Sequence, residues 1–150
     1  MYDSTIDTKK HIKRVRELLI EAMTELNYRG NKHDNTKLRS PEKTGFDEYT
    51  PKLKKTTYGS DEYKECLKGL GKILTHHYKH NSHHPEHYKN GIDDMDIFDI
   101  VEMLFDWKAA SERHKDGDIY KSIKQNKERF NMSPQLVKIF ENTICNMKLK

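Results

Sequence analysis

The segment Met95–Trp107, with the sequence MDIFDIVEMLFDW, is the most apolar stretch of the chain. Its apolar residues fall at helical spacings and surround most of the helix, which is typical of a helix buried on several sides. Asp93 or Asp94 can cap the N-terminus, because an aspartate side chain accepts hydrogen bonds from the first backbone N–H groups of a helix. We therefore expect this helix to be the central, buried element of the fold.

Further helices are predicted on both sides of this segment. An amphipathic helix of about residues 4–27 has apolar residues at spacings of three and four, and Gly30 and Asn31 are expected to end it. A second helix is predicted from Ser60 to about Asn81.

Toward the C-terminus, one helix is expected near residues 118–130 and another from Ser133, with Pro134 at its first position. No segment alternates as a strand would, and no internal repeat is present. The sequence thus predicts an all-α bundle of about five to seven helices.

The segment between the first two helices is polar and contains Pro41, Gly45 and Pro51. We expect a short helical turn around residues 34–38, followed by a long loop or a short helix. A long polar connection is more often functional than idle, so residues 39–59 are a candidate substrate lid.

Composition and length exclude several classes of protein. The 150 residues suit one domain, 1–150. The longest apolar runs, such as Leu18–Ile20, are far below the roughly 18 to 20 residues of a membrane span. The start of the chain shows no basic region followed by an apolar stretch, and Cys66 and Cys145 lack metal-site spacing. We expect a cytoplasmic protein without a membrane segment.

Histidine is the unusual component of the sequence. Six of the nine histidines fall within twelve residues, namely His76, His77, His80, His83, His84 and His87. Pro85 disfavours a helical conformation at His84, so this cluster is expected to span a helix end, a turn and a new short helix.

Other candidates lie outside this cluster: His11 on the first helix, the pair His33-Asp34 after it, and Asp106 in the apolar helix. Each alone has an ordinary explanation, such as a satisfied boundary histidine, a solvated turn or a pairing of Asp106 with a lysine or arginine. Their combination favours a metal site, because imidazole and carboxylate ligands suit divalent ions such as Fe, Mn, Co, Ni or Zn.

The order of these residues resembles the HD-domain superfamily of metal-dependent phosphohydrolases. Its helix with His-x-x-x-Val is matched by His11 and Val15, its His-Asp pair and following lysine by His33, Asp34 and Lys37, and its final aspartate by Asp106. The stretches from Leu74 to His77 and from Met95 to Asp106 look like those of small two-metal members. The sequence also resembles an uncharacterised HD-like family of phages and bacteria with closely spaced histidines. The resemblance covers about residues 8–112, and 113–150 would add C-terminal helices.

The resemblance implies a site with one or two divalent metal ions. His11, His33, Asp34 and Asp106 would hold the first ion, with Asp34 able to bridge to a second. His77 and His84 would be the ligands of the second ion, with His76, His80, His83 and His87 as substitutes.

The activity implied is hydrolysis of a phosphate ester or anhydride in a nucleotide or a nucleotide-derived signal. Asp34, Lys37 and His80 would be catalytic, and Lys37, Lys108 and Arg113 would contact the phosphorylated substrate.

Three alternatives stay open at this point. The same ligand set resembles HD-like di-iron oxygenases, and a metal-containing module could bind a nucleotide without cleaving it. Nucleic-acid binding is disfavoured, because the net charge of +4 is interleaved with acidic residues despite the basic and aromatic segment of Lys52–Lys55 with Tyr49 and Tyr58. A homo-oligomer is compatible with the sequence.

Overall fold

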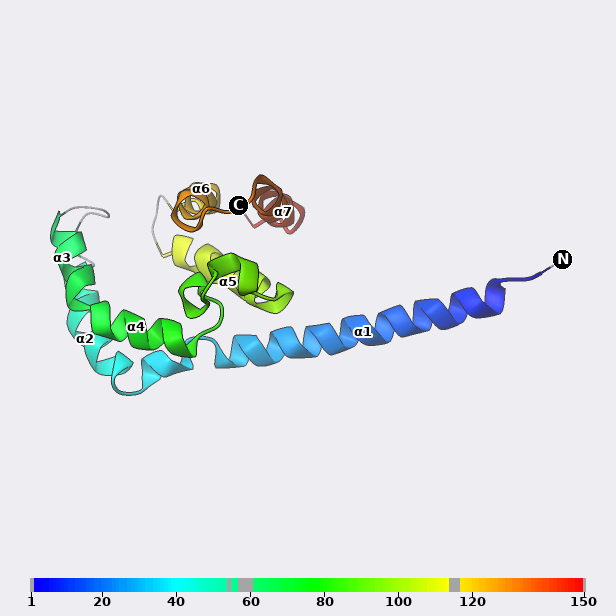
Figure 1. Cartoon of the computed structure of the whole chain (residues 1–150), viewed down its shortest axis with the longest axis horizontal. Coiled ribbons are helices and arrows are strands. Elements are labelled where there is room, and N and C mark those ends of the chain that lie inside the picture. Colours follow the sequence, from blue (N-terminus) through cyan, green and yellow to red (C-terminus); the bar gives the residue numbers. More distant parts are fainter. Residues whose placement is uncertain (1, 54, 57–60, 114–116, 150) are drawn as a thin grey trace. The chain divides into compact units, whose positions relative to one another are not determined.

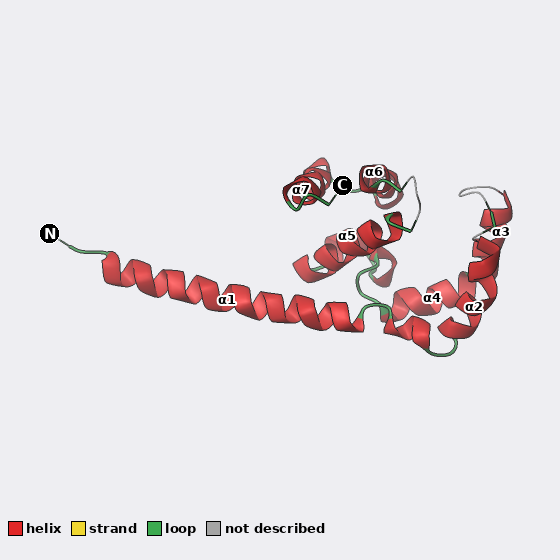
Figure 2. Cartoon of the chain, turned by 180° about the vertical axis from the view of Figure 1, so that it is seen from behind, coloured by secondary structure: helices red, strands yellow, loops and turns green. Residues whose placement is uncertain are grey.

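The computed structural model describes residues 2–53, 55–56, 61–113 and 117–149, with the side chain of Tyr63 left out. Its elements are α-helices and short 3₁₀ helices (η), and the described residues contain no strand, so the all-α prediction is confirmed (Figures 1 and 2). In chain order they are α1 (Thr5–Lys32), η1 (Asn35–Leu38), α2 (Glu42–Leu53), α3 (Asp61–Gly69), α4 (Gly71–His80), η2 (Pro85–His87), η3 (Gly91–Asp94), α5 (Ile97–Ser111), α6 (Ile119–Phe130) and α7 (Pro134–Asn146). No helix of the described residues is long and apolar enough to cross a membrane.

The chain forms two compact units, Met1–His33 and Asp34–Lys150. The first unit consists of α1, which runs through Gly30 and Asn31 to Lys32, so the predicted end of this helix was wrong. A glycine costs only about 1 kcal/mol relative to alanine inside a helix, which its neighbours offset. The Asn31 amide also donates a hydrogen bond to the carbonyl of Asn27, at 2.8 Å, along the same helix. The prediction of one domain over 1–150 stays a prediction.

Residues 97–107 of the apolar segment lie in α5, which packs against α6 and α7. Its N-cap is Asp96 rather than Asp93 or Asp94, which belong to η3. The Asp96 carboxylate accepts hydrogen bonds from the backbone of Phe98 and Asp99, and the Asp99 side chain accepts one in return from the backbone of Asp96. This reciprocal capping fixes where α5 begins.

The main apolar core lies between α5, α6 and α7. Met103 and Leu104 of α5 are buried together with residues of the two C-terminal helices, namely Ile119, Ile123, Met132, Phe140 and Ile144. Both C-terminal helices begin where the sequence predicts, with Asp118 and Ser133 as N-caps. The central role predicted for the apolar segment is therefore confirmed.

A second layer is formed by α2 packed on α4. Gly45 of α2 lies against Ile73 of α4, and Glu42 in the first turn of α2 is fully buried. The part of the expected lid within 42–53 is thus a packed helix, while its residues 54 and 57–59 lie outside the described part of the chain. The single helix predicted from Ser60 to Asn81 is divided at Leu70 into α3 and α4, and Ser60 itself is not described.

Close packing at Gly45 predicts that even a methyl group is harmful there. A Cβ atom would lie 2.5 Å from Cγ1 of Ile73, so Gly45→Ala must push α2 and α4 apart. We expect it to lower the free energy of unfolding by about 1–3 kcal/mol, as overpacking does elsewhere. Gly71→Ala is the control, because a Cβ atom there meets nothing within 4 Å. That variant should be neutral or slightly stabilising in urea unfolding, and equal stabilities for the two variants would contradict this packing.

Candidate metal centre

His77 lies in the last turn of α4 and is 1% exposed. The side chain of Asn81, the next residue after α4, donates hydrogen bonds to the carbonyl of His77 at 2.7 Å and to Oγ1 of Thr36 at 2.9 Å. These bonds end the helix and tie it to η1. The imidazole of His77 is therefore held at the border between α4 and the turn that follows Asp34.

His83 and His84 lie in the loop after α4. Pro85 follows directly, and His84 adopts an extended conformation with φ −102° and ψ 128°, as the residue before a proline is expected to do. The loop is fastened to α5, because the side chains of Ser82 and Tyr88 both donate hydrogen bonds to the buried Asp99 carboxylate at 2.6 Å. The two histidines are thus supported by the central helix.

Asp34 supplies the carboxylate that faces these histidines. Its backbone is left-handed, with φ 56° and ψ 14°, a conformation that aspartate adopts more readily than most residues other than glycine. Its carbonyl accepts a hydrogen bond from the backbone of Lys37 at 2.8 Å, which begins η1. This sharp turn places the Asp34 carboxylate beside the end of α4.

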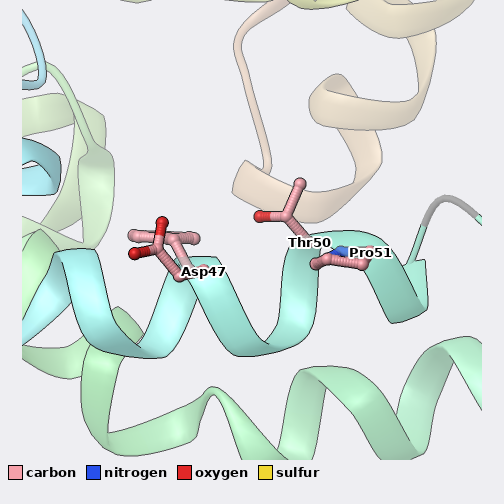
Figure 3. A pocket seen from close by; sticks show the side chains of 4 residues that line it. Asp47, Thr50 and Pro51 are labelled. Atoms are coloured by element: carbon pink, nitrogen blue, oxygen red, sulfur yellow. The ribbon is translucent and has the colours of Figure 1, made fainter.

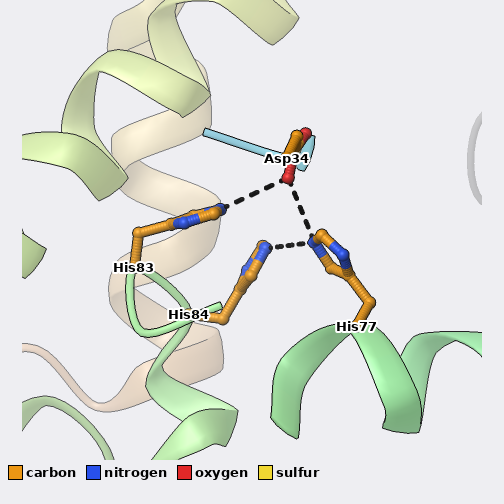
Figure 4. Close-up of side chains that lie close together, drawn as sticks. All are labelled: Asp34, His77, His83 and His84. Carbon is orange, nitrogen blue, oxygen red and sulfur yellow. Dashed lines mark hydrogen bonds and ion pairs between the residues drawn. The ribbon is translucent and has the colours of Figure 1, made fainter. Parts of the chain in front are cut away.

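The side chains of Asp34, His77, His83 and His84 converge (Figure 4), with one potential ligand atom from each lying within 4.8 Å of the others. Nε2 of His77 lies 2.9 Å from Nε2 of His84 and 3.3 Å from Oδ1 of Asp34, and Nε2 of His83 lies 3.7 Å from the same oxygen. Metal–ligand bonds of about 2.1 Å would place neighbouring ligand atoms roughly 3.0 to 3.4 Å apart. The separations of 2.9 to 3.7 Å lie near this range, so the four side chains form a group that could hold a divalent transition-metal ion.

Electrostatics keep two of these imidazoles neutral. Burial lowers the pKa of His84 from 6.5 to about 3, and the neighbouring His83 and His77 add to the shift against the smaller opposing effect of Asp106. Burial and the ammonium of Lys37 also lower the pKa of His77, although Glu42 and Asp34 oppose them. A neutral imidazole can bind a metal ion without first losing a proton.

A comparison with known protein families gives one match. Residues 1–146 match a family of unknown function, DUF5662. The chain belongs to DUF5662. No curated protein and no solved structure matches it.

In this DUF5662 protein, Lys37 and Phe46 lie next to the centre. Nζ of Lys37 lies 2.6 Å from Oδ2 of Asp34, so the two oxygens of this carboxylate face Lys37 and the histidines, respectively. The same ammonium lies 5.2 Å from the ring centre of Phe46, whose ring meets His77 edge-on at 6.2 Å. Phe46 also lines a pocket of about 520 Å³ together with Asp47, Thr50 and Pro51 (Figure 3).

The other site residues predicted from the sequence lie at the edge of the cluster or away from it. A carboxylate oxygen of Asp106 lies within 4.8 Å of a ring nitrogen of His83, so this aspartate borders the cluster. Lys108 is buried and pairs with Glu112 at 2.7 Å, and Arg113 follows α5 on the surface.

His80 does not join the four converging side chains, because its Nδ1 donates to the carbonyl of His76 and its ring stacks on His76. His11 lies within α1 and His33 at its C-cap, both in the first unit, so their predicted role as ligands stays a prediction.

Three residues of the site were not singled out from the sequence. His83 was one of several equivalent substitutes, and only its 2% exposure distinguishes it from the exposed His80 and His87. Glu42 and Glu102 contact the ring nitrogens of His77 and His83, across 35 and 19 residues of sequence, respectively. No local pattern in the DUF5662 sequence links residues so far apart.

The pKa of His84 predicts how the metal-free protein responds to acid. Because the folded state holds this ring neutral far below its ordinary pKa of 6.5, the unfolded state binds a proton more readily, and stability falls as the pH drops below about 6.5. Urea unfolding with a chelator at pH 7 and pH 5 should show a smaller fall for His84→Gln than for the wild type. The exposed His87→Gln is the control and should keep the wild-type fall. The same pH dependence in all three proteins would contradict the burial of a neutral His84.

Proposed function

We propose that this protein is a metal-dependent phosphohydrolase or phosphodiesterase with an HD-like centre. Its substrate would be a small phosphorylated molecule, a nucleotide or a nucleotide-derived signal. The observation that carries the proposal is the convergence of Asp34, His77, His83 and His84 beside the ammonium of Lys37. The resemblance of the sequence to HD-domain enzymes supports the same chemistry.

The donor set indicates which ions the centre would hold. Three imidazole nitrogens and one carboxylate suit Fe, Mn, Co, Ni or Zn, and an ion that prefers six ligands would keep positions for water and substrate. When bound, such an ion would polarise a phosphoryl oxygen and make water a stronger nucleophile. Asp106, beside His83, is placed to join the set or to accept a hydrogen bond there.

The surrounding residues would bind and orient the substrate. The Asp34 carboxylate lies between the ammonium of Lys37 and the histidines. From this position the ammonium can approach the phosphoryl oxygens of a substrate and offset their negative charge. Phe46 lies beside Lys37 and also lines the pocket on α2 with Asp47, Thr50 and Pro51, where the remainder of the substrate would bind.

A non-catalytic metal module is the second candidate. Four protein ligands complete the tetrahedral shell of a structural zinc ion, and the cluster offers four. This alternative predicts tight zinc binding, a large gain in stability on loading and no turnover with any divalent ion.

Metal content and activity together test the proposal. Protein without a histidine tag, loaded anaerobically with Mn²⁺ or Co²⁺, should bind one or two ions and release phosphate or a nucleotide from a panel of nucleotides. His83→Ala should lose bound metal and at least about 100-fold in activity, because it removes a buried imidazole from the centre. Lys37→Met should retain the metal and raise KM.

His87→Ala is the matched control, since its exposed ring bonds to the carbonyl of Tyr78 outside the four converging side chains. It should keep both metal and activity. Equal metal loss in His83→Ala and His87→Ala would indicate adventitious binding by surface histidines and contradict the proposed centre. Full metal occupancy without turnover would favour the structural module, and turnover only with oxygen would favour the oxygenase.

A further inference from the structure

Glu42 is a buried carboxylate that accepts hydrogen bonds from three neighbouring side chains. It lies in the first turn of α2 with 0% exposure, where an uncompensated charge would be very costly. His76 Nδ1 donates to Oε1 at 2.7 Å, and Thr36 Oγ1 and His77 Nδ1 both donate to Oε2 at 2.8 Å. These three donors converge on its two oxygens, so Glu42 accepts hydrogen bonds from all of them.

The tautomer of His77 follows from how the neighbouring donors use their hydrogen atoms. The Asn81 amide nitrogen lies 3.0 Å from Nδ1 of His77, but its two hydrogens are used by the carbonyl of His77 and by Oγ1 of Thr36. Thr36 in turn donates its only hydroxyl hydrogen to Glu42. Nδ1 of His77 must then carry a hydrogen itself in order to bond Glu42. The lone pair of His77 is consequently on Nε2, the atom that faces Asp34 and His84.

The same arrangement recurs at His83. Nδ1 of this ring lies 3.0 Å from Oε1 of Glu102 on α5, and Nε2 lies on the side of Asp34. Glu42 and Glu102 belong to different helices, yet each contacts Nδ1 of a histidine whose Nε2 points toward the centre. A carboxylate that accepts from the distal nitrogen of a metal-binding histidine fixes both the tautomer and the ring orientation.

We propose that Glu42 is the positioning residue of this centre: it holds His77 as the Nδ1–H tautomer and directs its Nε2 at the metal, as Glu102 does for His83. This inference rests on the proposed function, since it assigns a role at the same centre. It extends the site from its ligands to α2 and α5. It also gives a reason for a carboxylate at a fully buried position between α2 and α4.

The tautomer can be measured without metal. In the chelated protein labelled with ¹⁵N-histidine, long-range ¹H–¹⁵N correlation spectra should show His77 with a protonated Nδ1 and an unprotonated Nε2, assigned by comparison with His77→Gln. Glu42→Met should abolish this preference. A wild-type His77 that is protonated on Nε2 would overturn the inference regardless of how the protein binds metal.

Cobalt binding tests the consequence for the centre. Co²⁺ titrations followed by visible absorption should show binding about 10- to 100-fold weaker in Glu42→Met than in the wild type, with a changed spectrum. Glu42→Gln, whose amide oxygen can still accept from one ring, should lose less. Glu48→Met is the matched control on the same helix, because Glu48 is exposed and pairs with Lys52.

Each result decides a different claim. Wild-type affinity and spectrum in a folded Glu42→Met, or in Glu42→Gln if the first variant does not fold, would overturn the positioning role. A wild type with the expected tautomer but no Co²⁺ binding would refute the metal centre of the proposed function while leaving the action of Glu42 on His77 in place.

Discussion

The hydrogen bond from His77 to the buried Glu42 is the interaction on which the candidate centre depends. It joins α4 to α2, and it leaves Nε2 of His77 facing Asp34 and His84. The packing of Gly45 on Ile73 lets the two helices approach closely enough for this bond to form. A charged group is tolerated in this interface because Thr36, His76 and His77 all donate hydrogen bonds to it. The contact between α2 and α4 and the orientation of His77 therefore depend on the same carboxylate.

Two backbone features bring the side chains of Asp34 and His84 to this point. The left-handed turn at Asp34 directs its carboxylate toward the end of α4, and Pro85 holds His84 in an extended conformation. The buried Asp99 fastens the intervening loop to α5 through Ser82 and Tyr88. Burial raises the pKa of the Tyr88 hydroxyl to about 12, and the Asp99 carboxylate adds to this shift, so the hydroxyl remains a donor at any physiological pH. The loop that carries these histidines is thus held by α5, which has Met103 and Leu104 in the buried core, and this limits the freedom of the rings.

Local sequence signals predicted the C-terminal helices. The break before α4 and part of the site depend on contacts between residues that are distant in sequence. The helices α5, α6 and α7 were predicted because apolar spacing and the caps at Asp118 and Ser133 act within a few residues. The end of α1 and the break at Leu70 were not predicted, and the segment that forms α2 was left open as a long loop or a short helix, because its polar residues around Glu42 do not decide between the two until their tertiary contacts are known. At the site, family resemblance identified Asp34, His77 and His84, which do converge. It could not rank His83 or identify Glu42, since both depend on burial and on partners distant in sequence.

The central claim is that three imidazoles and one carboxylate together hold a divalent ion. X-ray absorption spectroscopy of the protein loaded with one equivalent of Co²⁺ tests it most directly. The account predicts multiple-scattering signals from three imidazole rings, with the remaining positions filled by oxygen. A spectrum with no more than one imidazole, or an ion that remains in solution at equimolar loading, would contradict it.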